Sequence, residues 1–156
     1  MILTIKTLKI ALSLQESTVL YNLNVKTEIL CENNKTLQEK LEFITQNIDN
    51  ESSISQCGEI IYDENVIVLK NAHNEVINVW RGANVAYLHN ATSPNVIRLE
   101  IDSNALYLIC NFRELLGIIK FLLETMLHCF EAQNNPTQRG QVIECLIDKL
   151  LEVERF

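Results

Sequence analysis

The sequence predicts an α+β fold: a seven-stranded antiparallel sandwich or partly open barrel, with one inserted helix and two C-terminal helices. Three observations predict it. Short runs of alternating apolar and polar residues follow one another quickly between Glu59 and Cys110. The linkers between these runs carry the Asn, Gly, Asp and Pro residues that tight turns use. A helix that is apolar on nearly every side follows, from Asn111 to Phe130.

The first two strands are predicted as a hairpin within residues 7–26. Apolar and polar residues alternate on both sides of a short polar turn, Gln15 to Thr18, and a period of two is typical of half-buried strands. The apolar members are Leu8, Ile10, Leu12 and Leu14 in the first strand, and Val19, Tyr21, Leu23 and Val25 in the second.

A helix is predicted next, over residues 36–49, inserted between the second and third strands. Leu37, Leu41, Ile44 and Ile48 recur at spacings of four, three and four, which places them on one face of a helix. The polar stretch from Asn47 to Gln56 predicts a flexible loop.

Five further strands and the long apolar helix follow. The strands are Glu59 to Leu69, with a bend at Asp63 to Asn65, then Glu75 to Trp80, Asn84 to Leu88, Val96 to Ile101 and Ala105 to Cys110. Asn111 and Glu114 have the spacing of a capping pair at the start of the helix. The helix carries two apolar stripes, so we expect it to be covered on two sides.

The chain ends in a second C-terminal helix. Asn135 to Thr137 break the preceding helix, and an apolar seam then repeats at three and four residues. The seam consists of Ile143, Leu146, Leu150 and Val153. We therefore expect an antiparallel domain over residues 1–134 and a helix over residues 135–156 that packs on this domain or on a partner.

Seven antiparallel strands followed by a long apolar helix resemble the pleckstrin-homology superfold. The resemblance lies in residues 57–130, notably in EVINVWRGANVAYLHN, NVIRLEI and ALYLICNFRELLGIIKFLLETM. It implies two orthogonal sheets closed at one corner by the helix. Two features depart from that superfold: the single tryptophan, Trp80, lies on a strand instead of in the final helix, and a helix separates the second and third strands.

The charge pattern argues against anionic partners. The net charge is -7, and the Lys and Arg residues are scattered, so no basic cluster can drive binding to nucleic acid or to an anionic membrane. Phosphoinositide-binding members of the resembled superfold use clustered cations near the first hairpin turn. Here only Lys6, Lys9 and Lys26 are nearby, so we expect no headgroup binding.

The sequence lacks the common motifs of catalytic, metal and cofactor sites. Five cysteines without a CxxC pair indicate reduced thiols in an intracellular protein of the cytoplasm or nucleus, and no stretch resembles a secretion signal. His73, His89 and His128 are too far apart to form a metal motif. With no GxSxG motif, no phosphate loop and only four glycines, we expect no enzyme, no metal and no cofactor.

These observations predict a non-catalytic adaptor or scaffold subunit of an intracellular multiprotein complex. Its partner, another protein or a second copy, is expected to bind the C-terminal helices through Ile143, Leu146, Leu150 and Val153, because obligate interfaces resemble a core cut in half. Trp80 and Arg81 form a second candidate contact, although a strand tryptophan is commonly part of the core. The alternatives are a lipid- or nucleic-acid-binding module of the pleckstrin-homology type, and a small enzyme whose site has no sequence motif.

Overall fold

The chain is an α+β protein with two separate sheets. The computed structural model describes residues 6–23, 26–31, 35–47, 57–130 and 137–153. These residues contain seven strands, which confirms the predicted class and strand count, but neither sheet closes into a barrel. The chain divides into two compact units, residues 1–49 with 94–115 and residues 50–93 with 116–156. The C-terminal helix therefore shares a unit with the strands near residue 60.

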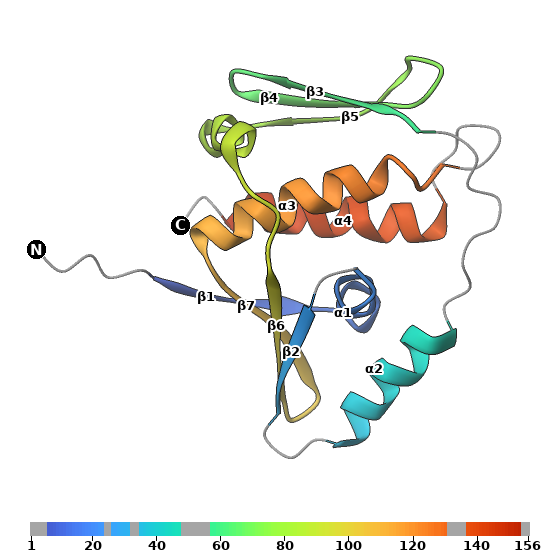
Figure 1. Cartoon of the computed structure of the whole chain (residues 1–156), viewed down its shortest axis with the longest axis vertical. Helices are drawn as coiled ribbons and strands as arrows, with labels where there is room; N and C mark the ends of the chain where they lie inside the picture. Colours follow the sequence, from blue (N-terminus) through green and yellow to red (C-terminus); the bar gives the residue numbers. More distant parts are fainter. Residues whose placement is uncertain (1–5, 24–25, 32–34, 48–56, 131–136, 154–156) are drawn as a thin grey trace, which may run out of the picture. The chain divides into compact units, whose positions relative to one another are not determined.

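The first unit contains a mixed four-stranded sheet. Its elements are β1 (Thr7–Leu12), α1 (Leu14–Tyr21), β2 (Lys26–Cys31), α2 (Lys35–Asn47), β6 (Val96–Asp102) and β7 (Ala105–Asn111). The strand order is β1-β7-β6-β2, with β1 and β6 both antiparallel to β7 (Figure 1). β2 runs parallel to β6, so the expectation of an entirely antiparallel fold is wrong at this pair. The parallel pair arises because α1 carries the chain from one edge of the sheet to the other.

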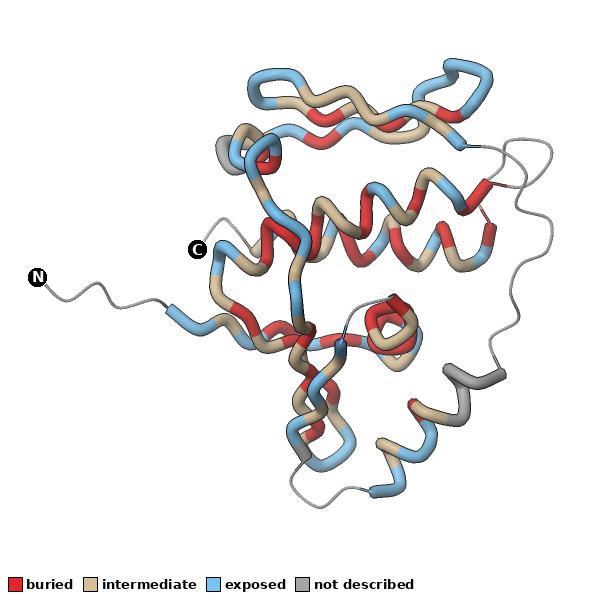
Figure 2. Tube along the Cα trace, in the orientation of Figure 1, coloured by how far each residue is buried: buried red, intermediate tan, exposed pale blue. Residues whose placement is uncertain are grey.

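One face of this sheet forms the core of the first unit. Burial alternates along β6 and β7, as the sequence pattern predicts (Figure 2). Ile97, Leu99 and Leu108 are fully buried on the core face. α1 contacts β1, β6 and β7, and it also contacts α2. The predicted inserted helix is confirmed as α2, whereas the loop predicted after Asn47, residues 48–56, lies outside the described residues.

The predicted N-terminal hairpin is wrong, because residues 14–21 form α1 instead of a turn and a strand. Ser13 caps this helix: the Glu16 N–H donates to Ser13 Oγ over 3.1 Å, and the Ser13 N–H donates to Glu16 Oε1 over 2.8 Å. The buried Ser17 and Thr18 hydroxyls donate to backbone carbonyls one turn earlier, so their polar groups are satisfied inside the unit. The second strand starts later, at Lys26.

The second unit contains an antiparallel three-stranded sheet. β3 (Glu59–Asp63), β4 (Val66–Lys70) and β5 (Val76–Arg81) follow one another as neighbours. The bend predicted at Asp63 to Asn65 is the turn between β3 and β4, so one predicted strand is in fact a hairpin. After β5 comes η1 (Ala83–Asn90), a 3₁₀ helix where a strand over Asn84 to Leu88 was predicted. Gly82 lies between β5 and η1. Its backbone has φ 152° and ψ 160°, a conformation essentially restricted to glycine.

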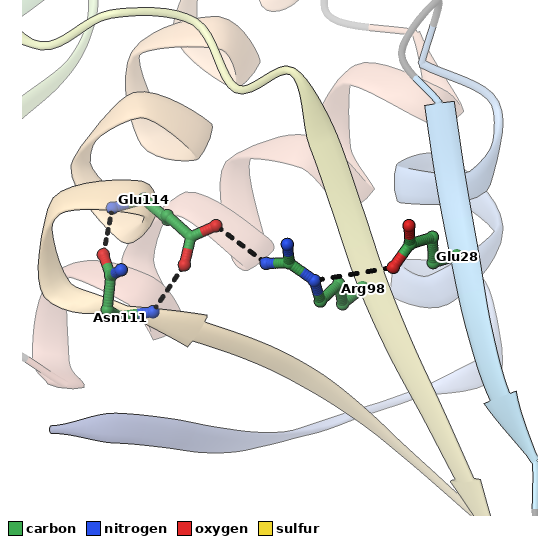
Figure 3. A network of polar contacts seen from close by, with 4 residues as sticks. All are labelled: Glu28, Arg98, Asn111 and Glu114. Carbon is green, nitrogen blue, oxygen red and sulfur yellow. Dashed lines mark hydrogen bonds and ion pairs between the residues drawn. The ribbon is translucent and has the colours of Figure 1, made fainter. Parts of the chain in front are cut away.

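Two helices complete the chain, α3 (Phe112–Met126) and α4 (Gln138–Val153). The predicted capping pair of α3 is confirmed: the Glu114 N–H donates to Asn111 Oδ1 over 2.8 Å, and the Asn111 N–H donates to Glu114 Oε1 over 3.1 Å (Figure 3). α3 ends four residues before Phe130, because the N–H groups of His128 and Cys129 bond three residues back and tighten the last turn. Nearly all residues of both apolar stripes are buried, as expected.

Candidate interaction surface

The inner face of the three-stranded sheet is closed by helices. Ile67 and Leu69 of β4 are fully buried, and Trp80 of β5 is 6% exposed. Residues 116–126 of α3 and the whole of α4 lie on this side of the sheet within the second unit (Figure 1). This face is therefore core and is not accessible to a partner.

Polar contacts fix β5 to α4. Asn78 Nδ2 donates to Glu144 Oε1 over 2.9 Å, and the Trp80 indole N–H donates to Asp148 Oδ1. Burial raises the pKa of Glu144 above its ordinary value, the nearby Asp148 raises it further, and the Asn78 hydrogen bond lowers it. The sheet and the helix are thus joined by one amide–carboxylate and one indole–carboxylate bond.

β3 is fixed to α3 by an aromatic cluster. The Lys120 ammonium lies 5.9 Å from the centroid of the Tyr62 ring, and it donates to the His89 carbonyl over 3.2 Å. The Tyr62 and His89 rings are tilted against each other, with their centroids 5.2 Å apart. Burial, followed by the charge of Glu124, raises the pKa of Tyr62 to about 12, so the phenol stays protonated at physiological pH.

The outer face of the same sheet is apolar and open. Residues opposite each other in an antiparallel register share a face, so Ile61, Val68 and Val79 form one row across the three strands. Val79 is 37% exposed and Val76 is 56% exposed. With Val66 these residues make an apolar surface of five side chains, which we call the outer apolar face: Ile61, Val66, Val68, Val76 and Val79.

Charged residues flank the outer apolar face at both ends. Asp63 and Arg81 lie on the two edge strands at one end, on either side of Val66. At the other end, Glu59 is paired in register with Lys70. Each end therefore carries one acidic and one basic side chain, and the apolar residues lie between them.

The predicted interaction residues differ in how far they are buried. Ile143, Leu146 and Leu150 are fully buried, Val153 is half-buried, Trp80 is in the core and Arg81 is exposed. The chain itself covers Ile143, Leu146 and Leu150. These residues therefore offer no exposed apolar surface to a partner. Only Arg81 lies at the edge of the outer apolar face.

The outer face of the four-stranded sheet has a different character, because its charges are paired (Figure 3). Arg98 Nη1 donates to Glu114 Oε2 over 3.0 Å, and Arg98 Nε lies 3.6 Å from Glu28 Oε2. Lys9 Nζ lies 2.9 Å from Glu100 Oε2. Both cations are therefore held by carboxylates.

A thiol and an imidazole meet in the second unit. Cys57 Sγ and His128 Nδ1 are 3.1 Å apart, and both residues are exposed. Among the described residues, no three His, Cys, Asp or Glu side chains are grouped as metal ligands. Sequence reasoning missed this pair because the two residues are far apart in the chain and no motif connects them.

Comparisons with known proteins add no relative. No family model, no curated protein and no solved structure matches the chain. Within the described part of the chain, no helix has both the length and the apolar character needed to cross a membrane.

The outer apolar face did have a sequence signal. Val66 to Leu69 reads VIVL, a strand that is apolar at consecutive positions, and such strands are typically buried on both faces. The sequence thus indicates that β4 has two apolar sides. It could not indicate that the helices cover only one of them.

Proposed function

We propose that this protein is a non-catalytic protein-interaction subunit of an intracellular complex, and that it associates through its outer apolar face with the same face of a second copy. The observation that supports this proposal most is that the outer face of β4 is apolar and only partly buried. Ile67 and Leu69 are fully buried on its inner side, whereas Val66 and Val68 on its outer side keep part of their surface in solvent. Apolar surface of this kind marks protein contacts when it is contiguous.

The charges at one end of the face favour a second copy as the occupant. A two-fold axis parallel to β4 places β3 of one copy opposite β5 of the other. Ile61 then faces Val79, and Asp63 faces Arg81 on both sides of the axis. An axis across the strands would instead place Asp63 opposite Glu59 and bring like charges together, which disfavours that arrangement. The two Lys70 side chains lie at the rim, where their ammonium groups reach water.

The dimer is expected to be weak, because the face is small. Three strands of five residues cover about 240 Å² at the spacing of strands in a sheet. A standard interface buries about 800 Å² per partner. The proposed contact, a two-sheet sandwich, therefore belongs to the transient class and forms at high local concentration.

The cysteines and the ion pairs support an intracellular location and a protein partner. Cys57, Cys110, Cys129 and Cys145 are free thiols, as in proteins of reducing compartments. The ion pairs of Lys9 and Arg98 disfavour lipid headgroups and nucleic acid as ligands. The resemblance to the pleckstrin-homology superfold stays a prediction, and the proposed interface does not depend on it.

Reciprocal charge changes test the proposal. Sedimentation velocity of the wild-type chain from about 1 to 500 µM, a range suited to a weak interface, should show a monomer–dimer equilibrium. Asp63→Arg and Arg81→Asp should each weaken the dimer several-fold, because each places like charges opposite one another. The double variant should restore the dimer. Restoration is the diagnostic result, because a general effect on folding or charge would not produce it.

A matched control uses the other sheet. Lys26→Asp reverses a charge on exposed β2 and should leave the dimer unchanged. A chain that stays monomeric over the whole range, or a double variant that is weaker than both single variants, contradicts the proposed interface.

A further inference from the structure

The cysteines Cys57, Cys110, Cys129 and Cys145 differ in their access to solvent and in their neighbours. Cys110 and Cys129 are 3% and 1% exposed, and burial, followed by the charge of Glu114, raises the pKa of Cys110 to about 12. A buried thiol of this kind is inert at physiological pH. Cys57 and Cys145 are exposed, and of these two the structure places an imidazole beside Cys57.

The Cys57–His128 contact has the geometry of proton transfer. At 3.1 Å, His128 Nδ1 can accept the thiol proton, and the resulting imidazolium can donate a hydrogen bond back to the thiolate. The thiolate is the nucleophilic form of cysteine. An adjacent base therefore favours reaction at this sulfur over reaction at Cys145.

The local structure holds both groups in place. Cys57 is followed by Gly58, where a Cβ would lie 2.0 Å from the Lys70 carbonyl oxygen, so only glycine permits this close approach to β4. His128 lies just after α3, and its N–H donates to the Thr125 carbonyl over 3.1 Å. The backbone beside each side chain is thus fixed by a contact of its own.

We propose that Cys57, with His128 as its base, is a modification site that reacts with hydroperoxides and is then capped by a small thiol of the glutathione type. The Cys57 thiolate attacks one peroxide oxygen, an S–O bond forms, and the O–O bond breaks. The sulfur is oxidised to a sulfenic acid, and the peroxide is reduced to an alcohol, or to water if it is hydrogen peroxide. The leaving oxygen of the peroxide takes its proton from the His128 imidazolium. The small thiol then attacks the sulfenic sulfur, which forms a mixed disulfide and releases water.

A metal ion fits this pair less well. Zinc sites in proteins use three or four side-chain ligands, and no third His, Cys, Asp or Glu is grouped with Cys57 and His128 among the described residues. Both side chains are exposed, which suits a reaction with a solute.

The test compares Cys57 with Cys145 in the same molecule. The reduced full-length chain is treated with limiting iodoacetamide at pH 7, and each cysteine is followed by peptide mass spectrometry. Cys57 should react about tenfold faster, because His128 can take up the thiol proton as the sulfur reacts. Hydrogen peroxide followed by glutathione should add one glutathione at Cys57 and none at Cys145.

Two variants identify the role of the imidazole. His128→Gln should lower the Cys57 rate to that of Cys145, without changing the Cys145 rate. His73→Gln, at an exposed histidine in a turn, should change neither rate. Equal rates for Cys57 and Cys145 in the wild-type chain, or an unchanged Cys57 rate in His128→Gln, would overturn the proposal. The wild-type comparison alone decides the matter if His128→Gln does not fold.

Discussion

The two sheets of this protein carry different kinds of side chain on their outer faces. The four-stranded sheet presents Lys9, Glu100, Arg98 and Glu28, which are joined by ion pairs across the strands. The three-stranded sheet presents five apolar side chains, and its charges lie at the two ends. Paired charges satisfy one another, whereas exposed apolar side chains gain free energy when they are covered. This difference is the reason why the proposed contact lies on the three-stranded sheet.

The largest expected effect separates the two sides of β4. Leu69→Glu places a charge among fully buried groups, at a cost of several kcal/mol, which is comparable with the whole stability of a domain. Val68→Glu, one residue earlier, points to the outer apolar face and should leave the chain folded while it abolishes self-association. Thermal melting followed by circular dichroism, with sedimentation velocity, measures both effects. Equal destabilisation by the two changes would mean that the outer face is also core.

A smaller effect is expected on the four-stranded sheet. Glu114→Ala removes the acceptor of the Asn111 N–H and the partner of Arg98, and should cost about 1–2 kcal/mol, as for other helix caps. Glu114→Gln keeps an oxygen for the cap and loses only a partly exposed ion pair, which is worth about 0.5 kcal/mol. Urea unfolding measures both variants. If they lose the same stability, charge pairing and not capping holds this corner of the unit.

The smallest effect concerns Glu144, whose carboxylate faces an amide and another acid instead of a cation. Because its pKa is raised in the folded chain, its contribution to stability is present below the ordinary carboxyl pKa of about 4.3 and is lost as the pH rises through the folded value. Glu144→Gln removes the charge and keeps an oxygen for Asn78. The variant should melt slightly above the wild type at pH 7, and the difference should shrink towards pH 4.

Glu152→Gln, at an exposed position of the same helix, serves as the control and should show no such pH dependence. A Glu144→Gln variant that melts below the wild type at pH 7 would mean that the ionised carboxylate stabilises the contact between β5 and α4.

Local signals in the sequence predicted the local structure well. The Asn111–Glu114 pair marked the start of α3, and alternation located β6 and β7. The same reasoning failed at α1, because Val19 and Tyr21 happen to alternate with other residues, and this alternation hid the Ser13–Glu16 capping box. A capping box specifies backbone hydrogen bonds, so it was the stronger signal here.

Contacts between distant segments could not be predicted. Nothing in residues 26–31 indicates that β2 pairs with β6 in parallel, since this choice depends on the rest of the sheet. The same limit applies to the Cys57–His128 pair, which exists only because the start of β3 and the end of α3 come together. For the outer apolar face, the run VIVL in β4 is visible in the sequence, but the side of the sheet that stays open is not.

The pairing of β2 with β6 also sets an order of events during synthesis. Lys26 pairs with Val96, and Thr7 pairs with Asn111, so the four-stranded sheet cannot close until residues 96–111 have left the ribosome. The β3–β4–β5 meander needs only neighbouring residues and closes short loops at low entropic cost. The nascent chain therefore carries β1 and β2 without their partner strands while β3, β4 and β5 pair with one another. Unpaired strands of this kind expose the chain to aggregation during synthesis.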